Sequence, residues 1–482
     1  MPNLLLSTLG NTPDIIEETI GVFNYDDNVD FYRNNKHVQV MRKELKRIDE
    51  AWPVSTGYLS DIEQRKLQSQ HFFTSYYLNE TETRSNFHIL YTFPPSKIEQ
   101  LKNDRIGLNP KMQKQELAWL KRLPKSDLHC HLGGVLTPAE LVRVSDMHSW
   151  KLEEFCYANP GYMRYYRSNM KANFQKFAKA GWKETVREIA DDLGVPRYAV
   201  SAPLLHQFEG NEEELKRLWY GACCDEMKFC GIGIERYEQL GDLQGSNLLD
   251  DIFGLERTLA LLLNRCYEEH VKYIEIRCSP LNYVNSEIPV QLVVNLICRV
   301  LEKAYPKVEA SLIFSISRHR DDMSRQYVEL VKQMSADPLF KKYFRGFDLA
   351  GNESARTPEK LRDPFMDILK ECYSITIHAG ETEEVESIWQ AVCHLNAERV
   401  GHGLKLLNNE DLLTKFLERG IAVEMCPSSN FQIVGFRDNY FEKETAHLPE
   451  YPLKAYLDRE LKVSVNTDNP GISLFLFFYH CV

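Results

Sequence analysis

The sequence lacks the features of a membrane or secreted protein. None of its apolar runs is long enough to span a bilayer. Its first residues, MPNLLLSTLGNTPD, have neither the basic segment nor the small-residue cleavage site of a secretory signal. The formal net charge of -11 argues against bulk binding of nucleic acid. We therefore expect a cytoplasmic protein with neither a membrane nor duplex nucleic acid among its partners.

The 12 cysteines include no CxxC pair, although they are spread along the whole chain. Most stand in apolar surroundings, as at Cys278, Cys298, Cys372 and Cys426. We interpret them as reduced core residues of a cytosolic protein.

The chain is 482 residues long, which is too long for one ordinary core, so we expect two domains unless one is a large barrel. Residues 1–103 alternate strand-like and helical stretches, with strands expected at 3–10, 51–54 and 87–93, which predicts a small parallel α/β domain. Residues 104–124 read as a linker that ends in a helix.

Ligands of parallel α/β sheets bind at the carboxyl ends of the strands, where helix N-termini favour phosphate. In the first domain these ends are small and rich in hydroxyl groups, which suits a phosphate or a nucleotide. Ordinary turn and capping chemistry explains the same residues equally well. The candidate effector-binding residues are Ser7, Thr8, Gly10, Asn11, Thr12, Thr56 and Gly57.

From residue 125 to residue 482 eight strands separated by helical stretches are predicted, the pattern of a (β/α)8 TIM-type barrel. The first crossover, from Val135 to about His270, is long and is expected to carry extra helices near the barrel mouth. Within it Tyr157–Lys171 is either a lid or, as we prefer, a solvated helix with an aromatic stripe facing the core. The predicted strands are 126–132, 271–278, 310–316, 344–350, 374–378, 397–402, 421–426 and 461–467.

His129 and His131 lie two residues apart in the first of these strands and so point to the same face. Alone, two such histidines are a weak signal. Functional residues of a barrel lie at the carboxyl ends of its strands, however, and these are the positions of His378, His402 and Asp468. The pattern therefore predicts one polar cluster at the mouth.

Imidazole and carboxylate ligands suit a zinc-like ion. We expect His129, His131, His378 and Asp468 to bind Zn²⁺ and to leave one position for water, whose pKa the ion lowers. Glu381, three residues after His378, is placed to act as a proton donor or shuttle. His402 is left to orient the water or to stabilise developing charge.

Six motifs in this order resemble the adenosine deaminase family over residues 120–470: LHCHLGG, GFDLAGNE, HAGE, RVGHG, MCPSSN and VNTDNP. The resemblance implies an amidohydrolase-like barrel and zinc-dependent attack of hydroxide at C6 of adenine. It gives catalytic roles to Glu381, His402 and Asp468, and places Gly351 against the base. The HxE and PCxxC motifs of the cytosine-editing zinc deaminases are absent.

The chain departs from this family at three places. Gly133 replaces an aspartate that contacts the ribose 5′-hydroxyl, and losing that charge removes repulsion toward a phosphate. We therefore predict a substrate with a 5′-phosphate, such as ATP. Asn469 replaces the second aspartate of a pair and can still donate to a purine nitrogen. The last helix of the family is missing, because an apolar tail follows Ser473; we expect this to expose apolar surface and to weaken the protein.

The stretches LLLSTLGNTP and VSTG resemble CRISPR-associated Rossmann-like (CARF) sensor domains, which bind cyclic oligoadenylates and occur fused to adenosine deaminase domains. This resemblance implies a homo-oligomer, with a cyclic oligoadenylate bound across a dimer of the first domain. Binding would switch on nucleotide deamination in antiviral defence. Two alternatives stay open: a stand-alone adenosine deaminase of purine salvage, and a signal-binding protein with a decayed barrel.

Overall fold

A computed structural model describes residues 113–146, 149–285, 288–320, 322–438 and 441–473. The predicted effector-binding residues between Ser7 and Gly57, and the tail after Ser473, lie outside these ranges. The chain divides into two compact units, Met1–Pro124 with Pro306–Val308, and Lys125–Tyr305 with Glu309–Val482. In the first unit the structure describes helix α8 (Gln113–Arg122).

The second unit is built on a single sheet of eight parallel strands, which follow one another in chain order. Each strand begins and ends within two residues of the range predicted from the sequence, which confirms the barrel. The strands are β1 (Lys125–His131), β2 (Val271–Cys278), β3 (Glu309–Ser317), β4 (Phe344–Ala350), β5 (Ser374–Ala379), β6 (Arg399–His402), β7 (Ala422–Met425) and β8 (Lys462–Val465).

The barrel closes between its first strand and the segment that follows its last. Cys130 forms an isolated parallel bridge with Asp468. The N–H of Asp468 donates to the carbonyl of His129, and the N–H of His131 donates to the carbonyl of Asp468, both at 2.7 Å. The closure therefore places the backbone of three predicted site residues side by side.

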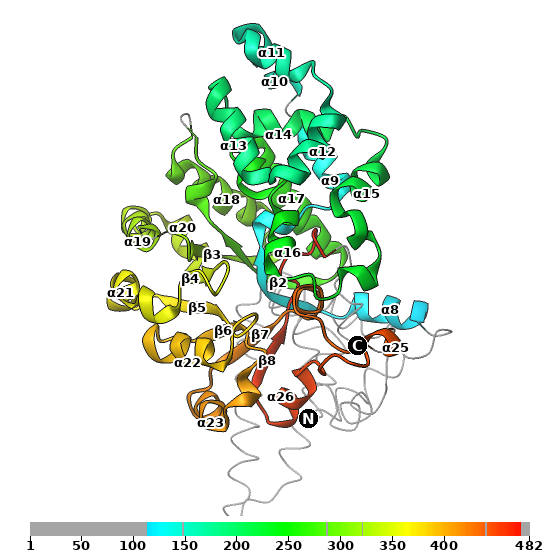
Figure 1. Cartoon of the computed structure of the whole chain (residues 1–482). Helices are drawn as coiled ribbons and strands as arrows, with labels where there is room; N and C mark the ends of the chain where they lie inside the picture. The colour runs from blue at the N-terminus through cyan, green and yellow to red at the C-terminus, as the bar shows by residue number, and fades with distance from the viewer. Residues whose placement is uncertain (1–112, 147–148, 286–287, 321, 439–440, 474–482) are drawn as a thin grey trace, which may run out of the picture. The chain divides into compact units, whose positions relative to one another are not determined.

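Helices follow most of the strands and pack around the barrel (Figure 1). In α18 the buried residues Val293, Val294, Ile297 and Leu301 form one stripe of helical spacing, which explains why this segment packs against the sheet as a helix. These helices are α18 (Val290–Ala304), α19 (Met323–Met334), α20 (Pro338–Tyr343), α21 (Arg362–Lys370), α22 (Val385–His394), α23 (Glu410–Arg419), α24 (Pro427–Ile433), α25 (Glu442–Thr445) and α26 (Leu453–Asp458).

The long first crossover forms a helical subdomain between β1 and β2 (Figure 1). In its last helix the N-cap Asp251 accepts from the N–H groups of Phe253 and Gly254, at 2.9 and 3.1 Å, which fixes the start of that helix. The helices are α9 (Pro138–Asp146), α10 (Ser149–Ala158), α11 (Pro160–Tyr166), α12 (Met170–Ala180), α13 (Trp182–Leu193), α14 (Arg197–His206), α15 (Glu212–Tyr220), α16 (Ile234–Gly241) and α17 (Ile252–Glu268).

The aromatic stretch Tyr157–Lys171 carries a packing role. The hydroxyls of Tyr162 and Tyr165 donate to the carbonyls of Ala199 and Val200 on α14, at 2.7 and 2.8 Å. Tyr162 is fully buried. The stretch is the aromatic stripe that we preferred over a lid.

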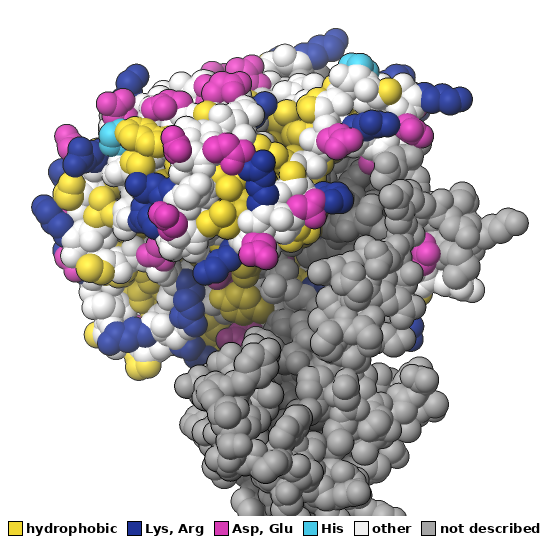
Figure 2. Space-filling model, turned by 90° about the horizontal axis from the view of Figure 1, so that it is seen from below, with side chains coloured by type: hydrophobic (Ala, Val, Ile, Leu, Met, Phe, Trp, Pro, Cys, Tyr) yellow, Lys and Arg dark blue, Asp and Glu magenta, His cyan; other side chains and the backbone are white. Residues whose placement is uncertain are grey.

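The described surface seen in Figure 2 mixes basic and acidic side chains, with hydrophobic ones between them. No helix among the described residues is long and apolar enough to cross a membrane. Cys278, Cys298 and Cys426 are buried as expected, and the cysteines of the described ranges are unpaired. The prediction that Cys372 lies in the core is wrong: this residue is exposed in the turn after α21, with φ of 55°.

Candidate metal centre and active site

Three histidines from two strands bring their Nε2 atoms together at the carboxyl end of the barrel. Nε2 of His129 lies 3.2 Å from Nε2 of His131, and Nε2 of His378 lies 3.0 Å from both. A tetrahedral ion about 2.0–2.1 Å from each nitrogen would space them roughly 3.3 Å apart. The spacing therefore fits one zinc-sized ion.

The outer nitrogens of two of these rings fix their tautomers. Nδ1 of His129 lies 3.0 Å from Glu424 Oε2, and Nδ1 of His378 lies 2.9 Å from Asp348 Oδ1. A carboxylate only accepts, so each Nδ1 carries the proton and each Nε2 presents a lone pair to the centre. Lone pairs facing each other at 3.0 Å repel unless a cation lies between them, so the donor set fits a metal ion.

The electrostatics of the site favour the neutral form of His129 and His131, the form that binds a metal. Burial lowers the pKa of His131 to about 3, with His378 adding to the effect. The pKa of His129 is held well below its ordinary value, first by burial and then by the positive charge of Arg277.

Asp468 completes the predicted ligand set from the segment after β8. Its Oδ1 lies 3.8 Å from Nε2 of His129 and 3.6 Å from Nε2 of His131. Its φ is +61°, a conformation that costs energy for a residue with a side chain and that recurs at functional sites. The structure thus places all four predicted metal ligands around one point.

A second group of possible metal ligands consists of His402, Cys426 and Asp468. The ligand atoms of these three residues lie within 4.8 Å of one another. The Cys426 thiol lies 3.8 Å from the carbonyl of Glu424, to which it donates, and burial raises its pKa well above the ordinary value. A protonated thiol is a poor ligand. The three-histidine group is therefore the better metal site.

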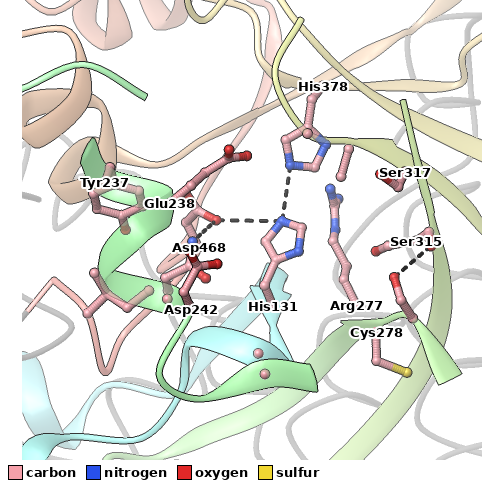
Figure 3. A pocket seen from close by; sticks show the side chains of 18 of the residues that line it. His131, Tyr237, Glu238, Asp242, Arg277, Cys278, Ser315, Ser317, His378 and Asp468 are labelled. Carbon is pink, nitrogen blue, oxygen red and sulfur yellow. Dashed lines mark hydrogen bonds and ion pairs between the residues drawn. The ribbon is translucent and has the colours of Figure 1, made fainter. Parts of the chain in front are cut away.

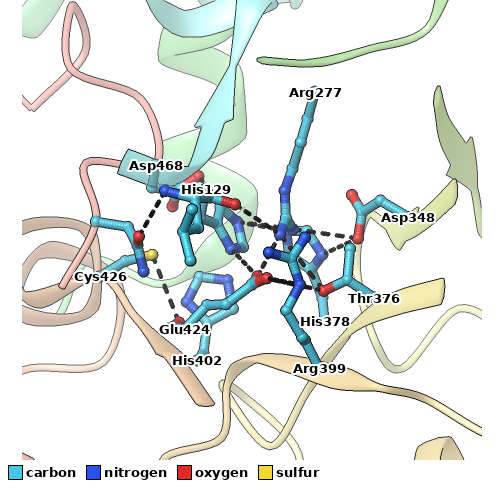
Figure 4. Close-up of polar contacts among 12 residues, drawn as sticks. His129, Arg277, Asp348, Thr376, His378, Arg399, His402, Glu424, Cys426 and Asp468 are labelled. Carbon is cyan, nitrogen blue, oxygen red and sulfur yellow. Dashed lines mark hydrogen bonds and ion pairs between the residues drawn. The ribbon is translucent and has the colours of Figure 1, made fainter. Parts of the chain in front are cut away.

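A buried ion network surrounds the histidines (Figure 4). Arg277, which has no exposed surface, pairs with Asp348 at 3.2 Å and with Glu424, and Arg399 pairs with Glu424 at 3.0 Å. Burial alone would raise the pKa of Asp348, but His378 and Arg277 hold it below its ordinary value. The network keeps Asp348 ionised where it orients His378. None of these four charged residues was predicted from the sequence to take part in the site.

Glu381 lies on the turn after β5 and is 6% exposed. Burial raises its pKa well above the ordinary value, and the nearby Asp468 and Glu353 add to the rise. The turn is held by Glu353, whose carboxylate accepts the N–H groups of Gly380 and Glu381 at 2.8 Å and that of Thr382 at 3.1 Å. Glu381 is thus held in place, and its surroundings favour the protonated acid.

His402 ends β6 with φ of +65° and is 1% exposed. Burial, followed by the nearby His378, lowers its pKa well below the ordinary value. Its ring centroid lies 5.0 Å from those of His129 and His378. The ring is therefore neutral and stands directly beside the histidine cluster.

A cavity of about 340 Å³ opens over the cluster, a size suited to a small ligand (Figure 3). His131, His378, Glu381, His402 and Asp468 face into it. The three predicted substrate-binding residues, Gly133, Gly351 and Asn469, also line it. The walls also include residues that the sequence did not single out, among them Lys183, Tyr237, Glu238, Asp242, Ser279, Asn282 and His319.

Comparisons with known proteins agree with this arrangement. The sequence model described as adenosine deaminase matches residues 250–475. An adenosine deaminase from Clostridium kluyveri is 26% identical over 356 residues, which cover 73% of this chain and 81% of that protein. One from Clostridium perfringens is 32% identical over 233 residues, 47% of this chain and 65% of that protein.

Among solved structures, an amidohydrolase from Burkholderia ambifaria with bound Zn is 20% identical, with a TM-score of 0.50. The match covers 74% of this chain and 78% of that one, and it shows the fold. The fold is a (β/α)8 barrel with the histidine cluster at the carboxyl ends of its strands. Over residues 250–475 the chain is similar to the adenosine deaminase family, and both clostridial relatives carry that name.

Proposed function

We propose that the protein hydrolyses the exocyclic amine of an adenine nucleoside or nucleotide and releases ammonia, with Zn²⁺ as its metal. One observation carries the proposal: three histidine nitrogens within 3.2 Å of each other, and a buried protonated Glu381, face the same cavity. Relatives named adenosine deaminase, and a zinc-bound structural neighbour, support the same chemistry.

The ion, held by His129, His131, His378 and Asp468, would supply the Lewis acidity that makes water a nucleophile near neutral pH. The residues of the chain supply the rest. Glu381, kept protonated by burial, donates a proton to N1 of the ring as C6 is attacked. His402, neutral beside the cluster, orients the attacking oxygen. Asn469 and Gly351 line the cavity where the base would bind.

We further propose that the substrate carries a 5′-phosphate and is ATP. Gly133 lines the cavity with no carboxylate at a position where the family has an aspartate, and Lys183 contributes a positive charge to the wall. Glu238 and Asp242 line the same cavity, so the balance of charge must be measured. The test is ammonia release from adenosine and ATP by the zinc-loaded protein.

A matched variant sharpens this comparison. Gly133→Asp restores the carboxylate, and it should lower the rate on ATP by about tenfold or more relative to the rate on adenosine, because the new charge repels phosphate. Gly133→Asn is the control of equal size without charge, and it should shift the ratio far less. Equal or faster turnover of adenosine by the parent protein would contradict the phosphate proposal.

Regulation is the third part of the proposal. If residues 1–103 bind a cyclic oligoadenylate, cyclic tetra- or hexa-adenylate should raise the rate of deamination. Turnover of adenosine that is independent of the ring nucleotide would favour a salvage enzyme instead. Absence of turnover under every condition, with the ring nucleotide still bound, would favour a decayed barrel that only senses the signal.

A further inference from the structure

Asn430 lies on α24 with no exposed surface, between the two residues that flank the histidine cluster. Its Nδ2 donates to Glu381 Oε1 at 2.9 Å and lies 3.0 Å from Nδ1 of His402. Glu381 and His402 come from separate turns, after β5 and at the end of β6. One side-chain amide thus joins the proton donor to the residue that orients the attacking oxygen.

The orientation of this amide is fixed by its other end. The backbone N–H of Cys426 donates to Oδ1 of Asn430 at 3.3 Å, and the hydroxyl of Tyr451 donates to the same atom at 3.0 Å. A backbone N–H can only donate, so the atom that it faces must be the oxygen. The nitrogen of the amide must therefore face Glu381 and His402.

The amide nitrogen can only donate, and it faces Glu381 Oε1 and Nδ1 of His402, which lie 3.3 Å from each other. A proton on Nδ1 would meet this donor, so we assign Nδ1 as an acceptor of the amide. In a neutral ring the proton then sits on Nε2. His402 is thereby fixed as a hydrogen-bond donor through Nε2.

We infer that Asn430 is a positioning residue that sets the tautomer of His402 and the side-chain position of Glu381 together. This inference rests on the proposed deaminase function for its kinetic consequence. With Nε2 protonated, His402 holds the attacking oxygen by donating to it and does not remove a proton from it. The same amide keeps Glu381 directed into the cavity.

The tautomer can be measured without any turnover. In protein labelled with [15N]histidine, the His402 signals are assigned by their loss in His402→Ala. We expect the parent protein to show the proton of His402 on Nε2. Asn430→Asp replaces the donor by an acceptor, so the proton should move to Nδ1. A proton on Nδ1 in the parent, or the same tautomer in both proteins, would overturn the inference.

Kinetics provide the second readout. Asn430→Asp keeps the oxygen that Cys426 and Tyr451 bind and replaces the donor nitrogen by a carboxylate oxygen of similar size, so it separates positioning from space filling. It should lower kcat by about 100-fold, leave KM within about threefold, and keep the metal. Asn430→Ala should lower kcat by a similar factor. It replaces the aspartate variant in this test if that variant does not fold.

Gln432→Glu is the matched control, because Gln432 is a fully buried amide on the same helix whose Nε2 donates to the carbonyl of Ser473 at 3.0 Å. It should lower stability and leave kcat within about threefold. Parental kcat in Asn430→Asp, or an equal kcat loss in Gln432→Glu, would overturn the inference. A parent protein that deaminates no adenine compound would refute the proposed function alone, and the tautomer measurement would still decide the role of Asn430.

Discussion

Oε1 of Glu353 accepts the backbone N–H of Glu381 at 2.8 Å, so one buried carboxylate holds the turn that carries another. Oε1 and Oε2 together accept three consecutive N–H groups and the hydroxyl of Ser387. Carboxylates that accept several hydrogen bonds are strongly fixed, and their charge acts on any ionisable neighbour. Glu353 therefore shapes both the position and the protonation of Glu381.

We expect Glu353→Gln to weaken the protein and to change its pH profile. The introduced amide nitrogen cannot accept, so one buried backbone N–H loses its partner, at a cost of about 1–3 kcal/mol in the free energy of unfolding. Loss of the negative charge removes one cause of the raised pKa of Glu381. Urea unfolding checks the first effect, and kcat against pH checks the second.

In this variant the alkaline fall of kcat should begin at lower pH than in the parent protein. Ser387→Ala is the control, since it removes one hydrogen bond to Glu353 and keeps the charge. An unchanged pH profile in Glu353→Gln would contradict the electrostatic role.

Glu381→Gln should lower kcat by roughly 100- to 10,000-fold while zinc content and fold stay unchanged, because the amide cannot protonate the ring. In the parent protein, the raised pKa keeps the carboxyl protonated near neutral pH, and the proton leaves as pH rises through that pKa. Activity should therefore fall on the alkaline side. A parent rate that rises steadily with pH would argue against Glu381 as the acid.

Metal binding should depend on the histidine ligands and on the carboxylates that orient their rings. His129→Ala should abolish both metal binding and activity. Asp348→Asn should weaken metal affinity by about 10- to 100-fold, since it removes the negative charge that strengthens the hydrogen bond to Nδ1 of His378. Metal content after dialysis against a chelator measures this. Equal retention of metal by Asp348→Asn and the parent would contradict the assigned role.

Two neighbouring glycines should respond differently to alanine. A Cβ at Gly134 would lie 2.0 Å from Oδ1 of Asn469, whereas one at Gly133 would meet nothing nearer than the Cα of Gly245 at 3.4 Å. Gly134→Ala should therefore cost about 1–3 kcal/mol and displace Asn469 from the cavity wall. Gly133→Ala should be tolerated. Thermal unfolding of the two variants compares them, and equal stability would show that Asn469 moves freely.

Much of the barrel could be predicted because most of its strands contain a short apolar stretch bounded by turn residues. The metal ligands could be predicted because His378 and Asp468, far apart in sequence, both end strands of one barrel, whose carboxyl ends meet. The structure brings these residues together with His129 and His131 as the pattern indicated.

The residues that position the site could not be predicted in the same way. Glu353 and Asn430 act on Glu381 across 28 and 49 residues, and their roles depend on loop conformations that no periodicity reveals. Asp348 and Glu424 lie within strands, where a polar residue in the sequence is usually interpreted as one that faces solvent. The sequence feature that could have identified them is a charged residue within an otherwise buried strand, because a buried charge needs a partner.

The central claim is metal-dependent deamination of an adenine compound at the histidine cluster. It is tested most directly by measuring ammonia release and bound metal together, on parent, His129→Ala and Glu381→Gln proteins supplied with adenosine or ATP, with and without cyclic oligoadenylate. We predict one zinc ion per chain and turnover in the parent, no metal and no turnover in His129→Ala, and metal without turnover in Glu381→Gln. Turnover by metal-free protein, or full activity of Glu381→Gln, would contradict the account.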